Sequence, residues 1–157
     1  MREACTILIL GVVAWLASRR WTDRLGAFLL TFGVWDLTYY VVLRLISGWP
    51  DALTNRDILF LIPVPWIGPV WAPVIVATIF VAVGSYLYWT AQRQRPYTVS
   101  DGLVLLSAAG GVVISFLVNW RDVLVSRPQD FRQWLYWLAL TGGTSWFVYV
   151  ERRRRLH

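Results

Sequence analysis

Three polar side chains within an apolar run are the first candidates for chemistry. Asp36, Tyr40 and Arg44 are four residues apart inside the apolar stretch 25–46. In an α-helix this spacing places all three on one face. A charged carboxylate at the middle of a bilayer costs about 2.5–3.5 kcal/mol on insertion scales, so residues of this kind commonly have a function. The trio therefore predicts an intramembrane polar site that could hold a proton, an ion or a small solute.

A structural interpretation competes with this one. Arg44 lies one turn from the predicted end of its helix, where a long side chain can extend to the lipid headgroups. Asp36 can instead accept hydrogen bonds from neighbouring helices, and suitable donors are Ser107, Ser115 and Thr144. Such contacts between membrane helices contribute about 0.6 kcal/mol on average. The sequence leaves both interpretations open.

A second candidate site lies in the proline-rich stretch 55–68. A threonine three residues before Asp57 gives a spacing that resembles a capping box, which predicts a short helix starting near residue 55. Pro63 and Pro65 should end this helix, because each lacks a backbone N–H and restricts the residue before it. We therefore expect a short interfacial or re-entrant segment, with a candidate outer-leaflet site made by Asp57, Pro63, Pro65 and Trp66. A rigid connector lying flat at the interface is the alternative.

Small residues recur every four positions in the apolar stretch 102–118. Ser107, Gly111 and Ser115 form this stripe. Small side chains let helix backbones approach each other closely in membranes. We therefore predict a helix-packing face, with a ligand groove as the alternative. The stripe does not indicate whether the partner helix belongs to this chain or to another protein.

Histidine and cysteine chemistry is nearly absent from the chain. Cys5 is the only cysteine and His157 the only histidine. One cysteine forms no disulfide within a chain, and these two residues offer no metal-binding spacing. A serine–histidine–acid set and a glycine-rich phosphate loop are also missing. The sequence thus predicts no catalytic residue, no metal and no cofactor, and it leaves room for a bound lipid.

The composition is that of a membrane protein. Of the 157 residues, 57% are hydrophobic and 15% are charged, whereas a typical soluble domain has about 25% charged residues. The mean hydropathy is +0.53. The net charge of +6 reflects fifteen arginines, and the chain has no lysine. Because the arginines cluster between apolar runs, we interpret them as determinants of membrane orientation and expect no nucleic-acid partner.

Five apolar stretches predict an all-α bundle of about five membrane helices in a single domain. A span needs about 20 mostly apolar residues. The predicted spans are about 4–18, 25–46, 69–90, 102–118 and 133–150. The first stretch is short and could instead be a cleaved secretory signal, although Trp15 is too large for the usual cleavage pattern. Four spans are the fallback.

The arginines and tryptophans indicate an orientation. With the C-terminus in the cytoplasm, nine arginines fall in cytoplasmic segments and five fall outside, while Arg44 lies within a span. Basic residues concentrate in the cytoplasmic loops of membrane proteins. Many of the eleven tryptophans fall near span ends, as in an aromatic belt. We predict a multi-pass protein of a bacterial-type plasma (inner) membrane, with the N-terminus outside and the C-terminus cytoplasmic.

The leading functional hypothesis is a small non-catalytic subunit that packs within a larger membrane protein complex of respiratory or photosynthetic type. It depends on the small size, the aromatic residues near span ends, the packing stripe and the missing cofactor ligands. The expected partners are the lipid bilayer and other membrane protein subunits. An oligomeric transporter of protons, ions or small solutes around Asp36 is the alternative. A membrane-embedded enzyme that modifies lipids or isoprenoids is a weaker alternative.

Overall fold

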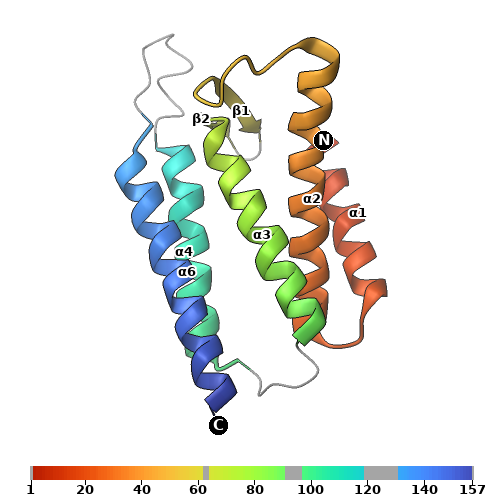
Figure 1. Ribbon diagram of the computed structural model, residues 1–157, viewed down its shortest axis with the longest axis vertical. Coiled ribbons are helices and arrows are strands. Elements are labelled where there is room, and N and C mark those ends of the chain that lie inside the picture. Colours follow the sequence, from red (N-terminus) through yellow and green to blue (C-terminus); the bar gives the residue numbers. More distant parts are fainter. Residues whose placement is uncertain (1, 62–63, 91–96, 119–130, 157) are drawn as a thin grey trace. The chain divides into compact units, whose positions relative to one another are not determined.

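The computed structural model describes residues 2–61, 64–90, 97–118 and 131–156, and these are mostly helical (Figure 1). The helices are α1 (Arg2–Ala17), α2 (Trp21–Ser47), α3 (Trp71–Thr90), α4 (Val99–Leu117) and α6 (Gln133–Leu156). Two strands lie between α2 and α3 in the sequence, β1 (Arg56–Phe60) and β2 (Trp66–Pro69). The chain divides into two compact units. Unit 1 comprises Met1–Asp57 and Pro69–Arg93, and unit 2 comprises Ile58–Gly68 and Gln94–His157.

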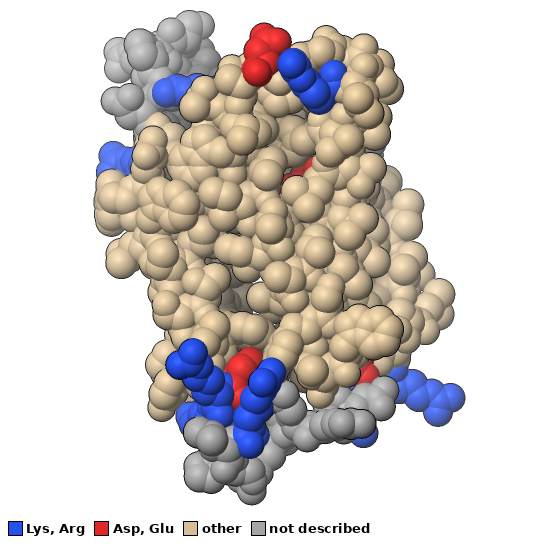
Figure 2. All heavy atoms as spheres, in the orientation of Figure 1, with Lys and Arg blue, Asp and Glu red and all other residues tan. Residues whose placement is uncertain are grey.

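Three of the described helices, α2, α3 and α4, are long and apolar enough to cross a membrane. α1 has 16 residues, and its length of about 24 Å is less than the roughly 30 Å of a hydrocarbon core. α6 has 24 residues, but tryptophan, tyrosine, threonine and glycine replace many of the aliphatic residues of a typical span. Figure 2 shows that charged side chains gather near helix ends, while uncharged side chains cover the helix middles. These helices are those of a membrane protein.

In unit 1, α2 and α3 pack with their backbones almost in contact, and glycines make this approach feasible. A Cβ added at Gly26 would lie 2.8 Å from the Tyr88 nitrogen, and one at Gly33 would lie 2.6 Å from the Ala77 oxygen. A Cβ at Gly84 would lie 2.7 Å from the Gly26 oxygen. The two glycines of α2 are seven residues apart, as are Ala77 and Gly84, which is the repeat of left-handed helix packing. α1 lies beside α2 in the same unit (Figure 1).

The proline-rich stretch forms a two-stranded sheet, so the short helix predicted near residue 55 is wrong, while the predicted helical class is confirmed as a mostly helical fold. The pairing extends past the strands, because the Val70 amide donates to the Asn55 carbonyl and the Trp71 amide to the Leu53 carbonyl, each at 2.9 Å. Five residues separate β1 from β2 in the sequence, which is too few to connect parallel strands. Because Pro63 and Pro65 would end a helix that starts near residue 55, that helix would have fewer than two turns. Strand pairing instead provides hydrogen-bond partners for the backbone N–H and C=O groups of this apolar segment.

In unit 2, α4 and α6 pack through one glycine and one alanine from each helix. A Cβ at Gly111 would lie 2.9 Å from the Ala139 Cβ, and one at Gly143 would lie 2.8 Å from the Ala108 Cβ. The two helices run side by side in Figure 1. Close packing of small residues is the usual way in which membrane helices associate. The contact therefore makes α4 and α6 a tightly joined pair.

An aromatic cluster holds β2 within unit 2. A Cβ at Gly68 would lie 2.7 Å from the Phe116 ring, so only glycine lets the strand approach this ring so closely. The Phe116 ring stacks on Phe131, with centroids 5.5 Å apart, and meets the edge of Tyr136 at 6.0 Å. Tyr136 is fully buried. The cluster thus joins the strand to α4 and to the start of α6.

Candidate functional site

A partly buried hydrogen bond in unit 1 joins α2 to β1. The Tyr40 hydroxyl donates to Asp57 Oδ2 at 2.9 Å. Tyr40 is 7% exposed, and Asp57 is half-buried. The sequence pattern assigns these two residues to separate candidate sites, and the structure brings them into one.

Asp36 lies one turn before Tyr40 on α2 and is half-buried. Its carboxyl group interacts electrostatically with that of Asp57, and so does the Tyr40 hydroxyl. Among the described residues, no hydrogen bond reaches the Asp36 side chain. Two carboxylates that interact in this way repel each other, and a proton or cation on either of them removes this repulsion. We call Asp36, Tyr40 and Asp57 the carboxylate site.

Arg44 is not part of the carboxylate site. Its guanidinium donates to the Gly48 carbonyl and lies 3.4 Å from Asp51 Oδ1. Both charged side chains are largely exposed, Arg44 at 54% and Asp51 at 87%. Gly48 has φ 73° and ends α2 as its C-cap, a conformation that glycine adopts without strain. Arg44 therefore extends towards the end of α2, where it contacts Gly48 and Asp51.

The remaining residues of the predicted outer-leaflet site belong to unit 2 or lie outside the described residues. Pro65 and Trp66 are half-buried and belong to unit 2. The Trp66 ring lies against Phe60 of the paired strand, with centroids 5.3 Å apart. Pro63 lies outside the described residues. Asp57 is thus hydrogen-bonded to Tyr40, and Trp66 is in a packing contact with Phe60.

The packing stripe of α4 differs by one position from the predicted one. Gly111 faces Ala139, and Ser115 is 4% exposed, but Ser107 is exposed. Because a helix turns about 100° per residue, Ser107 points away from the face on which its neighbour Ala108 meets α6.

The hydroxyls proposed as donors to Asp36 are bonded within their own helices. Ser107 donates to the Val104 carbonyl at 2.8 Å and Ser115 to the Val112 carbonyl at 2.6 Å. Thr144 likewise donates to the Leu140 carbonyl at 2.8 Å. A hydroxyl carries a single hydrogen to donate, so these side chains satisfy their own helix backbone.

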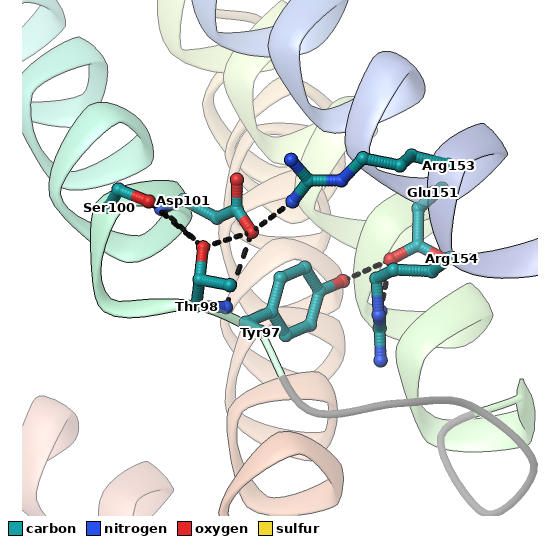
Figure 3. A network of polar contacts seen from close by, with 7 residues as sticks. All are labelled: Tyr97, Thr98, Ser100, Asp101, Glu151, Arg153 and Arg154. Carbon is teal, nitrogen blue, oxygen red and sulfur yellow. Dashed lines mark hydrogen bonds and ion pairs between the residues drawn. The ribbon is translucent and has the colours of Figure 1, made fainter. Parts of the chain in front are cut away.

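A second polar cluster, absent from the sequence prediction, lies where α4 begins and α6 ends (Figure 3). Asp101 is 1% exposed. Its Oδ2 accepts hydrogen bonds from the Thr98 hydroxyl at 2.5 Å, the Thr98 amide at 3.2 Å and the Arg153 guanidinium at 2.8 Å. Thr98 Oγ1 in turn accepts from the Asp101 amide at 3.3 Å. This reciprocal pair is a capping box that begins α4.

Glu151 is the second buried acid of this cluster, at 6% exposed. It accepts hydrogen bonds from the Tyr97 hydroxyl and from Arg154. The Arg154 guanidinium also lies over the Tyr97 ring, 3.9 Å from its centroid. Each buried acid is therefore matched by an arginine of α6, as Figure 3 shows. We call this set the polar network: Tyr97, Thr98, Ser100, Asp101, Glu151, Arg153 and Arg154.

The polar network links the start of α4 to the end of α6. Its charged groups are neutralised in pairs, Asp101 with Arg153 and Glu151 with Arg154. Only the capping-box spacing of Thr98 and Asp101 could have revealed part of it from the sequence. No group of three or more His, Cys, Asp or Glu that could hold a metal ion occurs among the residues that the structure describes. Compared with protein-family models, curated proteins and solved structures, the chain shows no significant match.

Proposed function

We propose that this chain is a small non-catalytic membrane subunit that packs within a larger membrane protein complex. The observation that carries the proposal is a pair of adjacent glycines on each of α4 and α6. Gly111 and Gly143 face inward and join the two helices. Their neighbours Gly110 and Gly142 face elsewhere, and a Cβ at either position would meet no described atom within 4 Å.

The outward glycines indicate a second helix contact. Glycine in a helix interior is about 0.8–1.0 kcal/mol less favourable than alanine, and in membranes glycines commonly lie where another backbone approaches. On α6, Ser145 is exposed one turn after Gly142. Exposed large side chains flank this small patch, Leu138 at 66% and Tyr149 at 54%. This succession of large, small and large side chains along α6 suits contact with a helix of another subunit better than contact with lipid chains alone.

The proposal includes the predicted topology. α1 and α6 would add two crossings to those of α2, α3 and α4, which gives five spans with the N-terminus outside and the C-terminus in the cytoplasm. The host would be a bacterial-type plasma membrane, and the complex would be of respiratory or photosynthetic type. In such a complex, neighbouring subunits would cover α1, which is too short to match the bilayer alone.

Adjacent glycines offer a matched test. The tagged protein is extracted from its native membrane in a mild detergent and sized by native mass spectrometry. We expect the wild type in a complex with other membrane proteins, and we expect Gly142→Leu or Gly110→Leu to release it as a folded single chain. Gly143→Leu should instead lower the thermal stability, because it separates α6 from α4.

Two results would contradict the subunit proposal. One is a wild-type protein that purifies as a lone stable monomer or as copies of itself only. The other is a Gly142→Leu variant that stays in the complex as firmly as the wild type does.

A second candidate function is a proton or ion pathway, and the carboxylate site favours it. The Tyr40 hydroxyl donates to Asp57 where α2 and β1 contact each other, and the Asp36 carboxyl lies one turn before Tyr40 and interacts electrostatically with Asp57. Asp36→Asn should abolish a pH- or potential-dependent flux in proteoliposomes while the protein still folds. Asp51→Asn, at the exposed Arg44 pair, is the matched control and should leave the flux intact. Unchanged flux in Asp36→Asn would exclude this function.

A further inference from the structure

The turn between α1 and α2 carries three arginines within six residues. Arg19 and Arg20 are exposed, and Arg24 is half-buried on the first turns of α2. We call these three arginines with Trp15 and Trp21 the arginine–tryptophan turn.

The one acid in this turn does not neutralise the arginines. Asp23 is 7% exposed and accepts a hydrogen bond from the Ser18 hydroxyl at 3.0 Å. Its other contact is the neighbouring Thr22 hydroxyl at 3.4 Å. Among the described residues, no ion pair involves Arg19, Arg20 or Arg24. The turn therefore presents three arginine side chains without an ion-pair partner, and its formal net charge with Asp23 included is +2.

Arg24 is held in position for binding an anion. Its Nε donates to the Ser18 carbonyl at 2.9 Å, and its guanidinium carbon lies 3.5 Å from the centroid of the Trp15 ring. With Nε occupied, the two terminal nitrogens remain as a fork of N–H groups that no described residue accepts. Such a fork matches two oxygens of a phosphate, and an arginine fixed on an aromatic ring loses little freedom on binding.

The two tryptophans indicate that the phosphate belongs to a lipid. Trp15 is 52% exposed and Trp21 is 74% exposed, and their rings meet edge to face with centroids 5.5 Å apart. Indole rings settle at the depth of the headgroups, with the apolar body towards the chains. The turn lies at the start of α2, a helix that is long and apolar enough to cross a membrane.

We infer that the arginine–tryptophan turn binds the headgroup of an anionic phospholipid such as phosphatidylglycerol. The Arg24 fork contacts the phosphate, Arg19 and Arg20 supply further positive charge, and the indoles cover the first part of the acyl chains. The positive charge of the three arginines disfavours a choline headgroup, so the turn discriminates against phosphatidylcholine. This inference does not depend on the proposed subunit function, and it applies to the chain alone as well as within a complex.

The experiment is a lipid titration of the purified full chain in detergent, read by native mass spectrometry. Phosphatidylglycerol should bind the wild type at least tenfold more tightly than phosphatidylcholine. An arginine near a membrane surface contributes a factor of about five in affinity for an anionic lipid. We therefore expect Arg24→Gln to weaken phosphatidylglycerol binding about fivefold or more. The double variant Arg19→Gln/Arg20→Gln, at two exposed positions, tests the turn even where Arg24→Gln perturbs folding.

Two further variants separate geometry from net charge. Arg24→Lys keeps the charge but loses the fork, so its binding should fall close to that of Arg24→Gln. Arg132→Gln makes the same charge change at an exposed position before α6 and should bind as the wild type does. An equal loss in the Arg132→Gln and Arg24→Gln variants would overturn the inference. Displacement of the lipid by inorganic phosphate at equal concentration would also overturn it, because the turn would then bind free anions.

Discussion

Among single residues, Asp101 shows how this chain keeps a charge away from water. Its side chain is almost fully buried, and three donors on Thr98 and Arg153 reach one of its oxygens. A buried polar group left without partners costs about 1–3 kcal/mol. The Arg153 side chain is 42% exposed, so solvent screens its ion pair and the Thr98 bonds provide most of the stabilisation.

Asp101→Asn should therefore lower the free energy of unfolding by about 1–3 kcal/mol. The amide keeps the shape of the carboxyl group but accepts hydrogen bonds more weakly and leaves Arg153 without its counter-charge. Unfolding of the purified protein in mixed detergent micelles provides the measurement. Ser107→Ala, at an exposed position of the same helix and outside the polar network, is the control and should change stability by less than about 0.5 kcal/mol. Equal stability of both variants would show that the polar network does not fasten α4.

Polar contacts were predictable where the partners are close in the sequence. The four-residue spacing of Asp36 and Tyr40 placed both on one helix face, and the structure shows them there. The Tyr40–Asp57 bond spans 17 residues and passes through a turn and a strand, so no spacing rule reveals it. The Tyr97–Glu151 bond spans 54 residues and depends on how α4 and α6 pack.

At the scale of helices, α2 and α3 approach each other closely, and glycine backbones form much of the contact surface. The heptad spacing of Gly26 and Gly33 is visible in the sequence, but no sequence pattern singles out Gly84, the glycine of α3 that faces α2. Its role is clear only from the structure, where any side chain would reach backbone atoms of α2. Backbone atoms cannot move aside as side-chain ends do.

Gly84→Ala should therefore destabilise the protein even though alanine is the better helix former. We expect a loss of about 1–3 kcal/mol, the usual cost of overpacking a close contact, measured by unfolding in mixed micelles. Gly11→Ala is the matched change in α1 of the same unit, where a Cβ meets no described atom within 4 Å. It should leave stability unchanged or raise it by up to about 1 kcal/mol. A neutral Gly84→Ala would show that α2 and α3 do not approach so closely.

The helices could be predicted from the sequence more reliably than the strands. Each predicted span overlaps a helix, because apolar runs bounded by arginines leave little choice in a membrane. α2 begins earlier than predicted, at Trp21, since its first turn carries polar residues that the hydropathy pattern excludes. Thr54 and Asp57 have the same spacing as Thr98 and Asp101, yet only the second pair caps a helix. The first pair precedes a segment that prolines keep short, whereas the second precedes a long apolar run.

For the whole molecule, the topology can be tested by cysteine labelling, because Cys5 is the only cysteine that has to be replaced first. In a Cys5→Ser background, cysteines are introduced one at a time by Glu3→Cys, Ala52→Cys and His157→Cys. With five spans and the N-terminus outside, a membrane-impermeant maleimide should label the first two in intact cells. It should label the third only after permeabilisation, because that residue comes after the arginine-rich end of α6.

The labelling pattern also discriminates between the alternatives. If residue 3 is protected and residue 52 is labelled, α1 does not cross and the protein has four spans. If residue 157 is labelled in intact cells and residue 52 is not, the orientation is inverted, and the excess of arginines on one side does not control insertion as the positive-inside rule expects.

The polar network also links events that are separated in time during synthesis. Asp101 is translated 52 residues before Arg153, and Tyr97 is translated 54 residues before Glu151. At about 5–20 residues per second, the start of α4 waits roughly 3–10 s for these partners. A nascent chain that stops before residue 151 leaves Asp101 and Tyr97 without them. Folding of this helix pair is thus completed only after α6 has been made. In an interrupted chain, Asp101 and Tyr97 at the start of α4 lack their partners, and a quality-control protease of the membrane could recognise the chain by this feature.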